Sequence, residues 1–157
     1  MDALAILLAI EEIKQLKARY FRCLDTKDWD GLSEIFCKDA IFDARAAYES
    51  DAGTTEASVS NNWLISGGDA IVHFISSNTH KGRITLHHGH GHEIEVISLE
   101  EARGVIAMED NNVTLENGAI ISSLHGWGHY HETYHKVDGQ WKILSSRISR
   151  LRVEAIP

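Results

Sequence analysis

Hydrophobic residues in the first quarter of the chain recur every three or four positions, the spacing of one face of an α-helix. This series predicts a long amphipathic helix that ends near Thr26 and contains Ile6, Ile10, Ile13, Leu16, Tyr20 and Leu24. Asp28 is a suitable N-cap for a short second helix, whose inward residues would be Trp29, Leu32, Ile35 and Phe36. The chain therefore begins with helices.

The next part of the chain alternates between short ordered elements and a long segment without a period. A brief strand is expected at Ala40–Asp43. Residues Ala44–Asn62 are rich in Ala, Ser, Thr, Asp and Glu, which indicates a long flexible loop of the kind that forms lids or oligomer contacts. Gly67–Asp69 opens a third helix that carries Ile71, Phe74 and Ile75.

From Arg83 onward the hydrophobic pattern changes to a period of two, which is typical of β-strands. Four segments follow, at Arg83–Ser98, Ala102–Leu115, Ala119–Val137 and Gln140–Val153. Glu116–Gly118 and Asp138–Gly139 have the composition of hairpin turns. Helices followed by a strand meander predict an α+β fold, with a strongly bent antiparallel sheet packed on the long N-terminal helix.

Length and charge narrow the class of protein. The 157 residues carry a net charge of −8 and fit one domain, residues 1–157, without internal repeats. No block of Lys and Arg is present, so nucleic acid binding is not expected. The apolar run Ala3–Ile10 follows Asp2 and leads into acidic residues, which favours a helix over a signal peptide. We therefore expect a cytoplasmic protein. No run is long enough to span a membrane.

Three stretches carry a family resemblance: Leu24–Leu32, Thr85–Gly89 and Tyr134–Ile143. The first resembles the helix-turn that bears a catalytic Asp in certain dehydratases, and the second resembles their Thr-x-His segment. The third resembles the last hairpin of a whole superfamily. By these motifs the chain is similar to the SnoaL-like and scytalone dehydratase-like family of the nuclear transport factor 2-like superfamily. That resemblance implies a cone-shaped fold with an apolar cavity closed by the helices.

The resemblance also implies a set of catalytic residues. Asp25 and His87 match the positions of the dehydratase dyad, and Tyr20 matches an active-site tyrosine of the bile acid dehydratase. A carboxylate that orients an imidazole makes a general base with a pKa near neutrality. The family's chemistry implies dehydration, isomerisation or cyclisation of a small apolar or polycyclic carbonyl or hydroxyl compound, without cofactor or metal.

Four further residues are candidates for substrate contact. Met108 and Tyr130 fall on strand faces expected to line the cavity, and Asn112 stands where scytalone dehydratase has a second histidine. Arg147 and Arg150 project from opposite faces of the last strand. We place Arg147 at the substrate, where it would hold an anionic group.

Ten histidines, eight of them between His87 and His135, suggest a second interpretation. Alternating His88, His90 and His92 are typical of metal sites. Strand alternation turns them away from a cavity that His87 faces, unless the strand bulges at Gly89 or Gly91. A metal-dependent enzyme therefore stays an alternative, as does a non-catalytic ligand-binding or assembly module on the same fold. The expected partners are a small-molecule substrate and, through the outer sheet face, a second or third copy of the chain.

Overall fold

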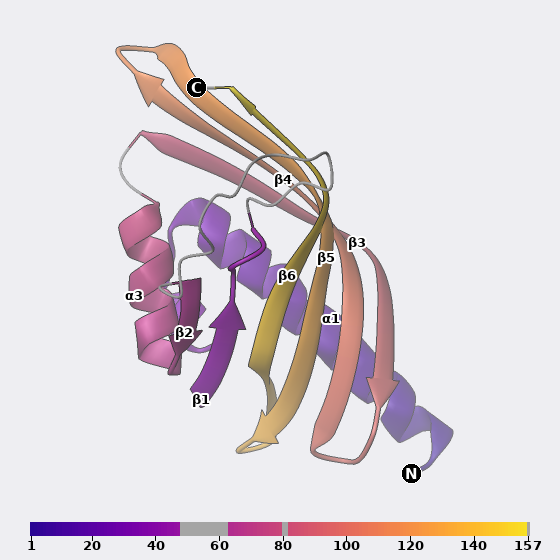
Figure 1. Ribbon diagram of the computed structural model, residues 1–157. Helices are drawn as coiled ribbons and strands as arrows, with labels where there is room; N and C mark the ends of the chain where they lie inside the picture. The colour runs from indigo at the N-terminus through magenta and orange to yellow at the C-terminus, as the bar shows by residue number, and fades with distance from the viewer. Residues whose placement is uncertain (48–62, 80–81, 157) are drawn as a thin grey trace.

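The computed structural model describes residues 1–47, 63–79 and 82–156 (Figure 1). Its helices are α1 (Ala3–Thr26), α2 (Trp29–Ser33) and α3 (Gly68–Asn78). Its strands are β1 (Phe36–Asp43), β2 (Leu64–Ser66), β3 (Arg83–Val96), β4 (Glu101–Glu116), β5 (Ala119–Val137) and β6 (Gln140–Ile156). The long loop expected at Ala44–Asn62 lies largely outside the described residues.

The expected α+β fold is confirmed, with one sheet of order β2-β1-β6-β5-β4-β3. Neighbouring strands are antiparallel except for β1 and β6, which lie side by side and run parallel. The prediction missed β2, which is only three residues long. It also placed Phe36 on the second helix, whereas Phe36 is buried as the first residue of β1.

Helix α1 lies across one face of the bent sheet, and α3 stands beside β1 and β2 (Figure 1). Asp2 caps the start of α1 by accepting a hydrogen bond from the Ala5 backbone N–H. Lys27 ends the helix in a left-handed conformation, with its N–H donating to carbonyls of the last turn. These two caps set the length of α1, so that Asp25 falls in its last turn.

The core between α1 and the sheet contains the predicted apolar face of the helix. Ile13, Leu16, Tyr20 and Leu24 are all at most 5% exposed. Cys23 and Cys37 are buried free thiols, and burial raises the pKa of each. No helix in the described parts of the chain is long and apolar enough to cross a membrane.

The strands bend because their pairing is interrupted by bulges. The register shifts between Gly89 and His92 in β3, and twice more where β5 pairs with β6. Gly89 also lets α1 approach the sheet, since a Cβ there would lie 2.6 Å from the Phe21 ring. The bent sheet therefore wraps around α1 and brings β3 next to the end of that helix.

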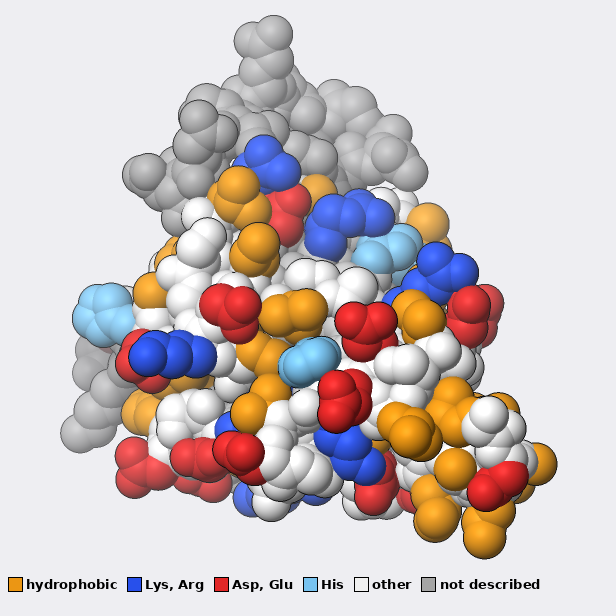
Figure 2. Space-filling view, turned by 90° about the horizontal axis from the view of Figure 1, so that it is seen from below, with side chains coloured by type: hydrophobic (Ala, Val, Ile, Leu, Met, Phe, Trp, Pro, Cys, Tyr) orange, Lys and Arg blue, Asp and Glu red, His pale blue; other side chains and the backbone are white. Residues whose placement is uncertain are grey.

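The surface is mixed in charge. Figure 2 shows acidic and basic side chains interspersed and hydrophobic side chains gathered at one end of the molecule. The start of α1 exposes a group of large apolar residues, which are Met1, Leu4, Leu7 and Leu8.

Candidate active site

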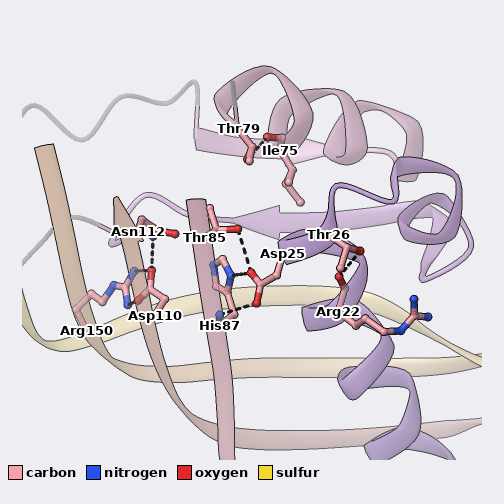
Figure 3. Close-up of polar contacts among 10 residues, drawn as sticks. All are labelled: Arg22, Asp25, Thr26, Ile75, Thr79, Thr85, His87, Asp110, Asn112 and Arg150. Atoms are coloured by element: carbon pink, nitrogen blue, oxygen red, sulfur yellow. Dashed lines mark hydrogen bonds and ion pairs between the residues drawn. The ribbon is translucent and has the colours of Figure 1, made fainter. Parts of the chain in front are cut away.

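The last turn of α1 brings Asp25 against His87 of β3 (Figure 3). The Asp25 Oδ1 lies 2.6 Å from His87 Nδ1 and accepts a hydrogen bond from the Thr85 hydroxyl at 3.0 Å. Its Oδ2 accepts the His87 backbone N–H at 2.9 Å. Three contacts from one strand therefore fix both carboxylate oxygens, and the carboxylate in turn fixes the imidazole ring.

This geometry determines the tautomer of His87. An ionised carboxylate only accepts hydrogen bonds, so Nδ1 carries the proton that lies between it and Asp25. The neutral ring then has its lone pair on Nε2, for which no side-chain donor is found among the described residues. The Phe21 ring lies nearly parallel to the imidazole, at 8° and 6.4 Å between centroids. Asp25 therefore holds the imidazole of His87 in one orientation.

A cavity of about 120 Å³ lies on the helix side of the sheet, and His87 forms part of its wall. Typical ligand pockets have volumes of ~300–1,000 Å³, so the space holds a small compound or one end of a larger one. Most of the wall is apolar, with contributions from Leu24, Phe42, Ala44, Ala47, Trp63, Phe74, Ile75, Leu124 and Ile148. Asp25 is not part of the wall and stands behind His87.

Four other candidates have well-defined places. Tyr20, Tyr130 and Asn112 line the cavity, and all three are buried. Met108 is buried outside the cavity wall, with its Sδ 3.2 Å from Arg150 Nη1. Met108 therefore packs against a residue of the site.

The two tyrosines are protonated phenols. Burial raises the pKa of Tyr20 well above its ordinary value, and the charge of Glu132 raises it further. The pKa of Tyr130 is raised as well, mainly by burial. Each hydroxyl is therefore a neutral hydrogen-bond donor at the cavity.

Sequence reasoning missed a buried ion pair in the wall of the cavity. Arg150 Nη1 lies 2.5 Å from Asp110 Oδ1, and Nη2 lies 3.1 Å from Asp110 Oδ2 (Figure 3). Both side chains are at most 5% exposed. Asp110 lies opposite His87 in the register of β3 and β4. It stands two positions after the apolar Met108 on β4, and this spacing was the sequence signal that places both residues on the inner face.

Arg147 was expected at the substrate, but it does not line the inner cavity. It lies exposed on the other face of β6 and lines an outer depression of the sheet, while Arg150 borders the inner cavity. Trp141 and Ile143 are buried, and strict alternation from them would carry Arg147 inward. The register shift opposite Thr133 and Tyr134 inserts one residue and reverses the alternation.

The histidine cluster lies mainly on the outer face. His125 Nε2 is 2.6 Å from Glu109 Oε1, and His90 Nε2 is 3.4 Å from the other oxygen of Glu109. The strand bulges after Gly89, as the sequence left open, and the bulge turns His92 to the helix side. Burial and the charges of nearby lysines lower the pKa of His92 there. Among the residues that the structure describes, no three His, Cys, Asp or Glu side chains are arranged to hold a metal ion.

The arrangement of a long helix, two short helices and a six-stranded bent sheet is shared with solved structures of other proteins. The chain belongs to the SnoaL-like domain family, whose model matches residues 5–147.

Individual relatives carry the names of several activities. "Probable cyclase FGR4" of Gibberella zeae is 29% identical over 141 residues, which are 88% of this chain and 89% of the relative. A protein named as a candidate scytalone dehydratase, from Novosphingobium aromaticivorans, superposes with a TM-score of 0.78 at 20% identity, over 98% of this chain and 91% of that one. A type 2 hexachlorocyclohexane dehydrochlorinase gives 0.74 at 17% identity, over 99% and 94%. These two structures show the shared fold.

Proposed function

We propose that this protein is a cofactor-independent acid–base enzyme of the dehydratase type, which acts on a small carbonyl or hydroxyl compound. The observation that carries the proposal is the Asp25–His87 pair, with the imidazole in the wall of a mainly apolar cavity. The named relatives support it, because cyclases, dehydratases and dehydrochlorinases all need a base that removes a proton from carbon.

In the proposed reaction, His87 Nε2 removes a proton from a carbon next to a carbonyl group. Asp25 stabilises the imidazolium that forms, through the 2.6 Å contact at Nδ1. Tyr20 donates a hydrogen bond to the carbonyl oxygen or to the departing hydroxyl. The C–H electron pair becomes the new C=C bond as the C–O bond breaks. The departing hydroxyl takes up the proton that His87 removed and leaves as water, so the imidazole becomes neutral again.

The surroundings favour such chemistry. The wall of the cavity is mainly apolar, and polar groups act more strongly on developing charge in such surroundings than in water. Asp25 is held by three hydrogen-bond donors of one strand, so the base needs no reorganisation when substrate enters. Isomerisation or cyclisation would use the same base, and the substrate decides among them.

The test is turnover of a panel of β-hydroxy ketones and their cyclic analogues, followed by mass spectrometry for the loss of one water molecule. With a compound that is turned over, His87→Gln should lower kcat by about 10²–10⁴-fold, the usual contribution of a general base. His88→Gln is the matched control, because His88 is exposed on the other face of β3. An active His87→Gln enzyme would refute the assignment, and a panel without any turnover would favour a binding module.

A second measurement tests the dyad without a substrate. Heteronuclear nitrogen NMR should show His87 as the Nδ1–H tautomer, because Asp25 accepts that proton. Asp25→Asn should change the tautomer or make it mixed, while Asp30→Asn on the exposed side of α2 should leave it unchanged. An Nε2–H tautomer in the unaltered protein would contradict the proposed base.

A further inference from the structure

Asn112 has one polar atom without a partner in the part of the chain that the structure describes. The residue lies on β4, is 8% exposed and forms part of the cavity wall. Its Nδ2 donates a hydrogen bond to Asp110 Oδ2 at 3.0 Å. Its Oδ1 is buried without a donor among the described residues. Buried acceptors are nearly always paired in folded proteins, so this atom calls for an explanation.

The orientation of the amide is fixed by its neighbour. The Asp110 carboxylate is paired with Arg150 and only accepts hydrogen bonds, so the amide nitrogen must face it. The amide oxygen then points away from Asp110, as the close-up shows (Figure 3). Flipping the amide group would place its oxygen, an acceptor, against the carboxylate oxygen of Asp110, which is also an acceptor. Oδ1 therefore remains an acceptor without a donor among the described residues.

The adjacent ion pair is already satisfied. Arg150 donates from Nε to the Ala47 carbonyl at 2.8 Å, from Nη1 to Asp110 and the Met108 sulfur, and from Nη2 to Asp110. These bonds occupy four of the five N–H groups of a guanidinium. The two opposite charges also neutralise each other. The ion pair therefore attracts an anionic group only weakly. Asn112 Oδ1, in contrast, can still accept a hydrogen bond from a ligand.

We propose that Asn112 Oδ1 accepts a hydrogen bond from a hydroxyl group of the substrate. Asn112 pairs in register with Thr85, and Asp110 with His87, so the acceptor and the base lie on neighbouring strands at one cavity. A ligand in contact with both would present its hydroxyl to β4 and its reacting carbon to β3. As a statement about the reacting substrate, this rests on the function proposed above.

The experiment compares two probes that differ in one donor. Binding of para-fluorophenol and para-fluoroanisole to the full-length protein is followed by fluorine NMR. The unaltered protein should bind the phenol about tenfold more tightly, because a buried site that pairs with a hydroxyl rejects the analogue without it. Asn112→Leu should remove that preference. Asn111→Leu is the matched control, since Asn111 is exposed on the other face of β4, and it should keep the preference.

A second readout avoids dependence on a variant that fails to fold. In the unaltered protein, the phenol should shift the side-chain amide signal of Asn112, and the methyl ether should not. Equal binding of the two probes, a preference that survives Asn112→Leu, or an unmoved amide signal would overturn the proposal. Since the assay measures binding alone, phenol recognition through Asn112 without turnover of any compound would contradict only the proposed reaction.

Discussion

Lys17 and Glu132 form an ion pair that water does not reach. Lys17 Nζ lies 2.6 Å from Glu132 Oε1, and both side chains are 0% exposed. Glu132 also accepts hydrogen bonds from the hydroxyls of Tyr134 and Ser146. The ammonium group of Lys17 is 3.5 Å from the centroid of the Tyr130 ring. This cation–π contact packs the ion pair against Tyr130, a residue of the cavity wall. Burial lowers the pKa of Lys17, and the charge of Glu132 opposes that shift.

Removing one partner of this pair should be costly. Lys17→Met leaves the Glu132 charge buried without its cation, which is expected to lower the free energy of unfolding by about 3–5 kcal/mol. Urea unfolding followed by circular dichroism measures the change. The double variant Lys17→Met with Glu132→Gln should recover part of the loss, because no unpaired charge remains. A single variant as stable as the parent would contradict this account.

At the scale of elements, bulges determine what the strands present to the cavity. Alternation along each strand is readable in the sequence, but one inserted residue reverses it from that point on. The bulge in β3 turns His92 toward the helix, and the bulge in β6 turns Arg150 inward in place of Arg147. Both depend on how neighbouring strands pair, which the local sequence does not specify.

Contact between α1 and β3 brings Asp25 to His87, and Gly89 permits that contact. Gly89→Ala would place a Cβ 2.6 Å from the buried Phe21 ring, so overpacking should lower stability by about 1–3 kcal/mol. Gly91→Ala is the matched control in the same strand, because a Cβ there meets nothing within 4 Å. Thermal unfolding of the two variants makes the comparison. Equal destabilisation of both would show that the close approach is not the cause.

At the scale of the whole molecule, the protein should be less stable in mild acid. The pKa values of His92 and His131 lie below the ordinary 6.5, in both cases mainly because of burial. The unfolded chain therefore binds more protons between the folded and unfolded pKa values, and the free energy of unfolding falls as the pH drops through 6.5. Calorimetry at about pH 7.5 and about pH 5.5 should show a lower Tm in acid.

The combined replacement of His92 and His131 by Gln provides the control for this pH effect. Without the two titrating groups, the difference in Tm between the two conditions should become smaller. A difference as large as in the unaltered protein would place the effect on other groups.

The association of chains stays a prediction. Family resemblance favours a dimer or trimer, and light scattering should then give two or three times the 17.5 kDa of one chain. The mass of a single chain at micromolar concentration would contradict it.

The sequence by itself determined the three helices, the four long strands and their order, although it missed the short strand β2. The period of α1, the period of the four long strands and the turn residues between them are local signals, and each element has local hydrogen bonds or alternation that such signals reflect. The motifs around Asp25 and His87 also identified the family. Tertiary structure alone decided which side chains meet. The 2.6 Å contact of Asp25 with His87 joins residues 62 positions apart. The Asp110–Arg150 pair and the unpartnered oxygen of Asn112 depend on register and bulges, which arise only when the whole sheet is assembled around α1.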